Sequence, residues 1–249
     1  MRATRVVVVT GIVWTAASAG GGALGQAADT PVPLYQEPRH HVVYESPAIR
    51  IHDIQIPPGD TTLFHTHDTA ILYVPIASSQ TRSQVLGAEW GGGGAAAAAP
   101  AAARSAEPAR PGKVNSVTTY VEKPYTHRVN NLGSTVFRLV GIANRTTGAA
   151  ADTDDASGLP APPELVNRWY RAHRLTLQAG QATPAHRHAT PVVVVMQTSG
   201  TAAVEGTVWS PLNGPGDIAR HDSGEHVVRN VGPGDVDLVE IEVRGATPR

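Results

Sequence analysis

The sequence predicts an all-β protein built from two related halves. Glycine (25) and proline (20) are abundant among 249 residues and only 16% of residues are charged, a composition that favours turns and short strands over amphipathic helices. Short stretches of β-branched residues recur between glycine- and proline-rich turns, as strands do. One histidine-containing pattern also occurs twice in the same order, which indicates an internal repeat of about 120 residues.

The repeated pattern holds six of the eleven histidines. Each copy runs glycine, five residues, His-x-His, and then a later His-x-x-x-Asn. The first copy contains Gly59, His65, His67, His127 and Asn131, and the second contains Gly180, His186, His188, His226 and Asn230. These two triplets of histidines are the candidate sites.

Strand patterns follow the same order in both halves. In the first half, an alternating stretch ends at Ile56 before the turn Pro57-Pro58-Gly59, and further strands are expected at 62–76, 117–121, 127–129 and 136–142. In the second half, strands are expected at 173–177, 192–196, 201–205 and 236–243. In the last of these, Val239, Ile241 and Val243 alternate with Glu240 and Glu242.

The first residues read as a secretory signal peptide at 1–27. Arg2 and Arg5 precede an apolar run, and a small-residue region ends in an A-x-A-like cleavage context before Ala28. The alternative is an uncleaved membrane anchor, but the many small residues make the run weakly hydrophobic. We therefore expect a secreted or periplasmic bacterial protein with no membrane association after cleavage.

Two low-complexity segments divide the rest of the chain. Residues 88–112 contain a glycine run, polyalanine and Pro/Ala repeats. This segment has too few large apolar side chains to offset the entropy lost on ordering, so we expect a disordered insertion in a surface loop. Residues 146–164 are the natural linker. The first domain is thus expected at 40–145 and the second at 165–249.

Charge and cysteine content exclude several classes of function. The formal net charge is −1 with no basic stripe, so no nucleic-acid partner is expected. The absence of cysteine excludes disulfides, a thiolate nucleophile and a zinc-thiolate site.

The histidine spacing has a direct structural meaning in a strand. Successive side chains point to opposite faces, so His65 and His67 share one face, as do His186 and His188. If the sheet curls into a barrel, the strands that carry His127 and His226 lie beside the His-x-His strands and complete each triplet.

This arrangement resembles the cupin superfamily, specifically its two-domain bicupins. The family's first motif, G(x)5HxH(x)3-4E(x)6G, is matched in part at Gly59, His65 and His67 and again at Gly180, His186 and His188. Its second motif is matched in part around His127 and Asn131 and around His226 and Asn230. The resemblance implies two tandem jelly-roll barrels, each with histidine metal ligands.

The family's glutamate ligand is missing from its usual place. It should fall near Ile71 or Leu72 and near Val192 or Val193, where the residues are aliphatic. Asp68 is close in sequence, but strand parity turns it away from the histidines. We therefore expect two three-histidine sites. Oxalate decarboxylases and germin-like oxidases use the glutamate, so its absence counts against both activities.

Three functions remain open for such a protein. Three neutral imidazoles suit a divalent metal, with Fe(II) favoured and Zn, Mn or Ni as alternatives. The resemblance to three-histidine cupins implies an Fe(II)-dependent dioxygenase acting on a small chelating substrate. The alternatives are a non-catalytic cupin that binds a small ligand, and a Zn-, Mn- or Ni-dependent lyase or isomerase. A homo-oligomer is also possible, since cupin barrels often associate through their sheets.

Other residues near the motifs receive simpler interpretations. Phe64 and Tyr125 flank the first triplet and are expected in the core, while His40 and His41 are expected in solvent. His221 could line the second site but is expected to be exposed in a turn. Trp90 and Trp209 adjoin loops and are assigned to no ligand.

Overall fold

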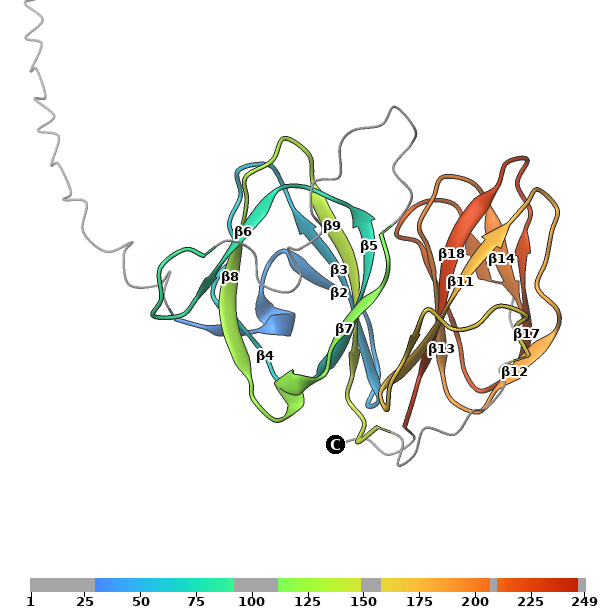
Figure 1. Cartoon of the computed structure of the whole chain (residues 1–249), viewed down its shortest axis with the longest axis horizontal. Coiled ribbons are helices and arrows are strands. Elements are labelled where there is room, and N and C mark those ends of the chain that lie inside the picture. Colours follow the sequence, from blue (N-terminus) through green and yellow to red (C-terminus); the bar gives the residue numbers. More distant parts are fainter. Residues whose placement is uncertain (1–29, 92–111, 149–157, 207–209, 246–249) are drawn as a thin grey trace, which may run out of the picture.

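The computed structural model describes residues 30–91, 112–148, 158–206 and 210–245, which form two β-barrels side by side (Figure 1). The expected all-β fold of two tandem barrels is confirmed. The expected signal peptide at 1–27 lies outside the described residues, as do most of the expected insertion (92–111) and the middle of the expected linker (149–157). Within the described ranges, no helix is long and apolar enough to cross a membrane.

Each barrel is made of one five-stranded and one four-stranded sheet. In the first barrel, the five-stranded sheet has the order β2 (His40–Glu45), β3 (Ile49–Ile56), β9 (Phe137–Asn144), β5 (Ala70–Ala77) and β7 (Asn115–Val117). The four-stranded sheet has the order β1 (Val32–Pro33), β4 (His65–His67), β8 (Tyr125–Asn131) and β6 (Thr81–Val85). Two 3-10 turns complete this barrel, η2 (Leu34–Gln36) and η3 (Thr119–Val121).

The second barrel repeats this plan. Its five-stranded sheet has the order β10 (Leu165–Val166), β11 (Tyr170–Leu177), β18 (Val236–Val243), β13 (Val192–Met196) and β16 (Ile218–His221). Its four-stranded sheet has the order β12 (His186–His188), β17 (Gly224–Asn230), β14 (Ala202–Glu205) and β15 (Ser210–Leu212).

The glycine and asparagine of each repeated pattern form matching turns. Gly59 and Gly180 have φ angles of 76° and 75°, a left-handed conformation that glycine adopts without a Cβ clash. The amide of Asn131 donates to the carbonyls of Ile56 and Thr135. Asn230 does the same with Leu177 and Gly234. The asparagines therefore tie the strands that carry the third histidines to the neighbouring turns.

The two five-stranded sheets pack face to face between the barrels, where β5 and β9 lie opposite β11, β18 and β13 (Figure 1). The cluster of apolar side chains at this interface comes from both barrels and includes Leu72, Val140, Ile142, Val193, Val239 and Ile241. The buried hydroxyl of Tyr170 accepts a hydrogen bond from the backbone N–H of Asn144 and lies 2.7 Å from the carbonyl oxygen of Ala70. The barrels thus share one hydrophobic core across the interface.

This packing determines the orientation of β18. Val239, Ile241 and Val243 lie in the interface core. Because side chains alternate along a strand, Glu240 and Glu242 point the other way, into the second barrel. Both glutamates are buried, and Glu240 is only 1% exposed.

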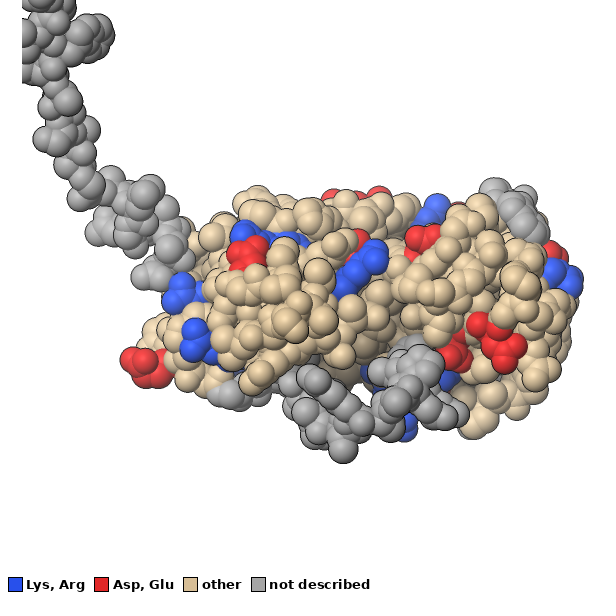
Figure 2. All heavy atoms as spheres, turned by 90° about the horizontal axis from the view of Figure 1, so that it is seen from above, with Lys and Arg blue, Asp and Glu red and all other residues tan. Residues whose placement is uncertain are grey.

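On the face shown in Figure 2, basic and acidic side chains are interspersed and neither sign gathers into a patch. This agrees with the formal net charge of −1.

Candidate metal centres

Three histidines converge inside the first barrel. His65 on β4 lies directly opposite His127 on the neighbouring strand β8, and His67 lies two residues along on the same face. All three rings are buried, with exposed fractions of 1%, 3% and 8% for His65, His67 and His127. One ring nitrogen from each lies within 4.8 Å of the others. The structure therefore brings the first triplet together, as the strand geometry predicts.

Hydrogen bonds orient these rings through their Nδ1 atoms. His65 Nδ1 donates to the Leu63 carbonyl at 2.9 Å, so the neutral ring carries its proton there and leaves Nε2 with a free lone pair. His127 Nδ1 lies 2.9 Å from Ser83 Oγ, and His67 Nδ1 lies 3.4 Å from the Tyr73 hydroxyl. Among the described residues, no hydrogen-bond partner reaches the buried His65 Nε2. His67 Nε2 and His127 Nε2 lie 3.0 Å from each other, so the only partners of the three Nε2 atoms among the described residues are within the triplet. Outer hydrogen bonds on Nδ1 are the usual arrangement of histidine metal ligands.

Burial keeps the first triplet neutral. It lowers the pKa of His127 to about 3, with a further contribution from the neighbouring His65. Burial and the adjacent rings also hold the pKa of His67 well below its usual range. Since a metal binds the neutral imidazole, these rings are ready to act as ligands at neutral pH.

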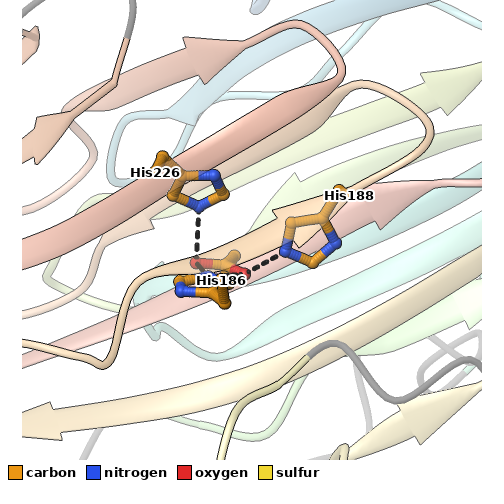
Figure 3. Close-up of side chains that lie close together, drawn as sticks. His186, His188 and His226 are labelled. Atoms are coloured by element: carbon orange, nitrogen blue, oxygen red, sulfur yellow. Dashed lines mark hydrogen bonds and ion pairs between the residues drawn. The ribbon is translucent and has the colours of Figure 1, made fainter.

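The second barrel holds its triplet in the same way. His186 on β12 lies opposite His226 on β17, and His188 shares their face. His186 Nδ1 donates to the Pro184 carbonyl at 2.8 Å, as His65 does to Leu63 in the first barrel. The three rings converge from two strands, and the dashed lines from His188 and His226 lead to a carboxylate beside His186 (Figure 3).

That carboxylate belongs to Glu240, which corrects the expectation that the second site has three histidines and no acidic ligand. Glu240 Oε1 lies 3.0 Å from His186 Nε2 and 2.8 Å from His188 Nε2. Glu240 Oε2 lies 3.2 Å from His226 Nε2. The usual motif position is aliphatic, as expected, but a carboxylate arrives from β18 instead. The sequence did not predict Glu240 as a ligand, because only the packing between the barrels turns the polar face of β18 toward the inside of the second barrel.

The second site differs from the first because it contains a charged carboxylate. Burial alone would raise the pKa of Glu240, but hydrogen bonds from the three histidines outweigh it and hold this pKa well below its usual range. Burial opposes the charged form of His188, yet the hydrogen bond that it donates to Glu240 and the nearby carboxylate of Glu242 raise its pKa to about 9. Without a metal, protons on His186 and His188, whose pKa values are raised, therefore balance the charge of the buried carboxylate.

The spacing of the ligand atoms fits one divalent ion in each barrel. In octahedral coordination, two adjacent ligand atoms that each lie about 2.1 Å from the ion are about 3 Å apart. His67 Nε2 and His127 Nε2 are separated by 3.0 Å. In the second barrel, the distances from Glu240 to the three histidines span 2.8 to 3.2 Å. Both donor sets suit a divalent metal.

Gly141 occupies the position in the first barrel that Glu240 occupies in the second. Each lies ten residues beyond the asparagine of its pattern and on the corresponding strand, β9 or β18. A Cβ atom at Gly141 would lie 3.1 Å from Ile54 Cδ1 and 3.3 Å from Ile71 Cδ1, tighter than ordinary contacts. The aliphatic side chains around Gly141 therefore leave the first site without room for a carboxylate from this strand.

Two further histidines border the sites and correct expectations from the sequence. His40 is buried rather than solvated, with its ring centroid 4.5 Å from that of His65 and its Nδ1 paired with Glu37. His221 is also buried rather than exposed in a turn, with its ring 4.9 Å from that of His226. His41 is exposed, as expected.

Aromatic side chains border the first triplet. Tyr120 and Tyr125 are half-buried and stack with ring centroids 5.6 Å apart and planes 6° apart. The Tyr120 ring lies 4.9 Å from the ring of His67, and the Tyr125 ring lies 4.8 Å from that of His127. Burial raises the pKa of Tyr120 to about 12, so its hydroxyl stays protonated.

The remaining candidates lie away from the triplets or outside the described residues. Phe64 is buried, as expected, and Asp68 is exposed. Trp90 packs against Arg82 and Arg128. Trp209 lies outside the described residues.

Comparison with known proteins supports the fold. No protein-family model matches the chain, and no curated protein sequence does. Among solved structures, AerE from Microcystis aeruginosa superposes with a TM-score of 0.53 at 13% identity, over 83% of this chain and 98% of AerE. A salicylate 1,2-dioxygenase from Pseudaminobacter salicylatoxidans gives 0.51 at 13% identity, over 80% and 72%. A variant of that dioxygenase in complex with gentisate gives 0.51 at 12% identity, over 80% and 70%.

At these identities the similarity concerns the fold. Together with the two histidine triplets and their strand order, it shows that the chain has the two-barrel cupin fold.

Without metal, the first barrel should lose stability in mild acid. The folded protein keeps His127 neutral down to a pKa of about 3, whereas the unfolded chain binds a proton there with an ordinary pKa of about 6.5. The contribution of the neutral His127 ring to the stability is therefore complete at pH values above about 6.5, the pKa of His127 in the unfolded chain. This contribution is lost as the pH falls toward about 3, its pKa in the folded protein. Urea unfolding of chelator-treated protein should show midpoints that fall between about pH 6.5 and pH 5.

A His127→Gln variant should show a shallower decline, because glutamine does not titrate. His41→Gln, on an exposed residue, should decline as steeply as the wild type. Midpoints that do not change over this pH interval, or a variant at residue 127 that declines as steeply as the wild type, would contradict the assignment.

Proposed function

We propose that the chain is an exported, metal-dependent bicupin whose first barrel is an Fe(II)-dependent dioxygenase site for a small chelating substrate. The observation that carries the proposal is the first triplet itself. Three buried histidines each place a ring nitrogen within 4.8 Å of the others, and the strand that could add a carboxylate has Gly141 at the corresponding position.

The charge of the first site favours an anionic substrate. Three neutral imidazoles leave both positive charges of a divalent ion uncompensated, so an anionic group that approaches the ion is attracted strongly in a buried environment. Three protein ligands also leave coordination positions open for a bidentate ligand and a second small molecule. The donor set thus favours a chelating acid, phenolate or enolate.

The walls of the first site favour a planar substrate. Tyr120 and Tyr125 present flat rings beside His67 and His127. Aromatic faces stack with planar rings and conjugated acids. The protonated hydroxyl of Tyr120 can donate a hydrogen bond to a substrate oxygen. Tyr73 contacts His67 Nδ1, which positions that ring rather than the substrate.

Each protein group then has a defined role. His65, His67 and His127 would hold the ion, and iron(II) would supply the redox chemistry that oxygenation requires. Leu63 and Ser83 hold two of the rings through Nδ1, and this orients their Nε2 atoms. The dioxygenase that shares the fold acts on salicylate by its name and has been solved with gentisate, and both are small chelating aromatic acids. This supports the proposed substrate class.

Oxygen consumption tests this function. Iron(II)-loaded protein should consume dioxygen with at least one member of a panel containing salicylate, gentisate and a β-diketone. His65→Ala should lower that rate on the order of 100-fold or more, because a missing ligand costs more than a missing outer partner. His186→Ala, the matched change in the second barrel, should keep most of the activity.

A failure of iron-loaded protein to consume oxygen with the whole panel would contradict the dioxygenase assignment. Thermal stabilisation by a panel member that is recovered unchanged would instead support a ligand-binding cupin. Activity lost with His186→Ala but kept with His65→Ala would move the catalytic site to the second barrel.

Export is a separate part of the proposal. The basic residues, apolar run and cleavage context within 1–27 support it. N-terminal sequencing of protein expressed in a bacterial host should find a mature chain that begins near Ala28 in the periplasm or medium. Full-length protein confined to the cytoplasm would contradict export.

A further inference from the structure

We infer that the second barrel positions one wall of the first site. It contributes a clasp of three side chains, Arg174, Glu164 and Gln197, which hold the start of segment 112–121 of the first barrel. This segment leads to Tyr120. The inference deepens the proposed function and rests on it, because Tyr120 is the proposed wall of the substrate site. The clasp residues act through Tyr120 and are therefore positioning residues.

The clasp binds the carbonyl oxygen of Gly112 with two donors. Arg174 Nη2 donates to this oxygen at 3.0 Å, and Gln197 Nε2 donates to it at 3.3 Å. Gln197 Nε2 also donates to the carbonyl of Pro75, on β5, at 2.9 Å. Gln197 is only 4% exposed, and a buried amide that lost these acceptors would be unfavourable. The clasp therefore fixes the start of the segment beside β5.

Glu164 fixes the next backbone group. Its Oε1 accepts a hydrogen bond from the backbone N–H of Val114 at 2.9 Å. Val114 is buried in the core shared by both barrels, where an unpaired N–H would be unfavourable. Arg174 orients the carboxylate, because its Nε donates to Glu164 Oε2 at 2.9 Å and its Nη1 donates to Gln197 Oε1 at 2.7 Å. One guanidinium thus holds both other members of the clasp.

A further contact from the second barrel lies along the same segment. Asn167 Nδ2 donates to Ser116 Oγ at 3.0 Å. Asn167 is itself fixed, because its Oδ1 accepts hydrogen bonds from two backbone N–H groups. Ser116 belongs to β7, which pairs with β5 over three residues and lies at the edge of its sheet. A short edge strand has few backbone bonds of its own, so its position depends on these outside contacts.

The segment continues directly into the wall of the first site. β7 ends at Val117, and the turn η3, which contains Tyr120, begins two residues later. The hydrogen bonds of this turn run back to the carbonyls of Thr118 and Thr119, so the turn stays attached to the end of β7. The position of Tyr120 therefore follows the position of β7.

The other half of the wall comes from a different element. Tyr125 lies on β8, opposite His67 on β4. Its ring stacks on that of Tyr120 with centroids 5.6 Å apart. The stack thus joins a residue held by the pairing of the first barrel's own strands to a residue held through the clasp. A shift of β7 would separate the two rings.

A second arginine makes the reciprocal contact. Arg138 of the first barrel donates through Nη1 to the carbonyl of Pro215 in the second at 3.0 Å, and it is paired with Asp53 of its own barrel. Pro215 precedes β16, the edge strand that corresponds to β7. β16 ends at His221, whose ring lies 4.9 Å from that of His226. Each barrel therefore holds the chain just before the edge strand of the other.

Fluorine NMR of protein labelled with 3-fluorotyrosine tests the inference. The chain has six tyrosines, and the variants Tyr120→Phe and Tyr125→Phe assign the two resonances of the stack. Arg174→Gln removes the guanidinium that joins the clasp and should move or broaden both resonances by more than a line width. The resonance of Tyr35, which packs against Arg50, should stay in place.

Kinetics give the functional readout. With a panel member that the iron-loaded protein consumes, Arg174→Gln should raise KM by about 2- to 10-fold, the worth of one aromatic stacking contact, and change kcat less. Added to Tyr120→Ala, it should cause no further rise, since both changes act on the same contact. A loss confined to kcat would overturn the inference.

Two further variants keep the NMR test decisive. Ser116→Ala removes only a hydroxyl group, so it carries little risk to folding, and it should shift the Tyr120 resonance by a smaller amount. Arg229→Gln is the matched control, because it breaks an arginine–glutamate pair within the second barrel and should leave both resonances of the stack in place.

Unmoved resonances of Tyr120 and Tyr125 in folded Arg174→Gln would overturn the inference, as would equal movement in Arg229→Gln. If Arg174→Gln does not fold, an unmoved Tyr120 resonance in Ser116→Ala has the same meaning. Neither substrate nor metal is added for the NMR measurement, so the positioning of Tyr120 and the dioxygenase assignment can fail independently.

Discussion

The face-to-face packing of the two five-stranded sheets is the constraint on which the rest of the structure depends. It buries the outer surfaces of β5, β9, β13 and β18 in one apolar core. A strand in such a sheet has no solvent-facing side, so its polar residues must lie inside a barrel and find partners there. In β18 this places Glu240 against three histidines, and in β9 the same arrangement leaves Gly141 among aliphatic side chains.

One repeated pattern therefore produces two chemically different sites. The histidines, their strand pairing and the carbonyl that orients the first ring agree between the barrels. The difference comes from one position on the interface sheet. A neutral donor set suits the binding of an anionic substrate to the ion, whereas a set that contains a carboxylate already compensates part of the ion's charge. The two barrels thus share the ligands from the four-stranded sheet and differ in the residue that the five-stranded sheet contributes.

Much of this could be predicted from the sequence because the relevant signals are local. The His-x-His spacing places two rings on one face, and the strands 192–196 and 236–243 have the limits expected from their apolar runs. The contribution of Glu240 could not be predicted, because alternation along 236–243 does not say which face is inner. If one face of this sheet were solvated, Val239 and Val243 would be expected to point into the second barrel. The first barrel packs against that outer face, so the apolar side chains point toward the interface instead. His40 was missed for a similar reason, since its burial depends on contact with His65 from a distant strand.

The account depends on two metal centres with different ligand sets, and anomalous scattering from a crystal of the zinc-loaded protein measures this directly. The account predicts two peaks at the zinc absorption edge. One should lie among His65, His67 and His127 with no protein carboxylate as a ligand, and the other within about 2.2 Å of a Glu240 oxygen. A second-barrel peak coordinated without Glu240, or no peak in either triplet, would contradict it.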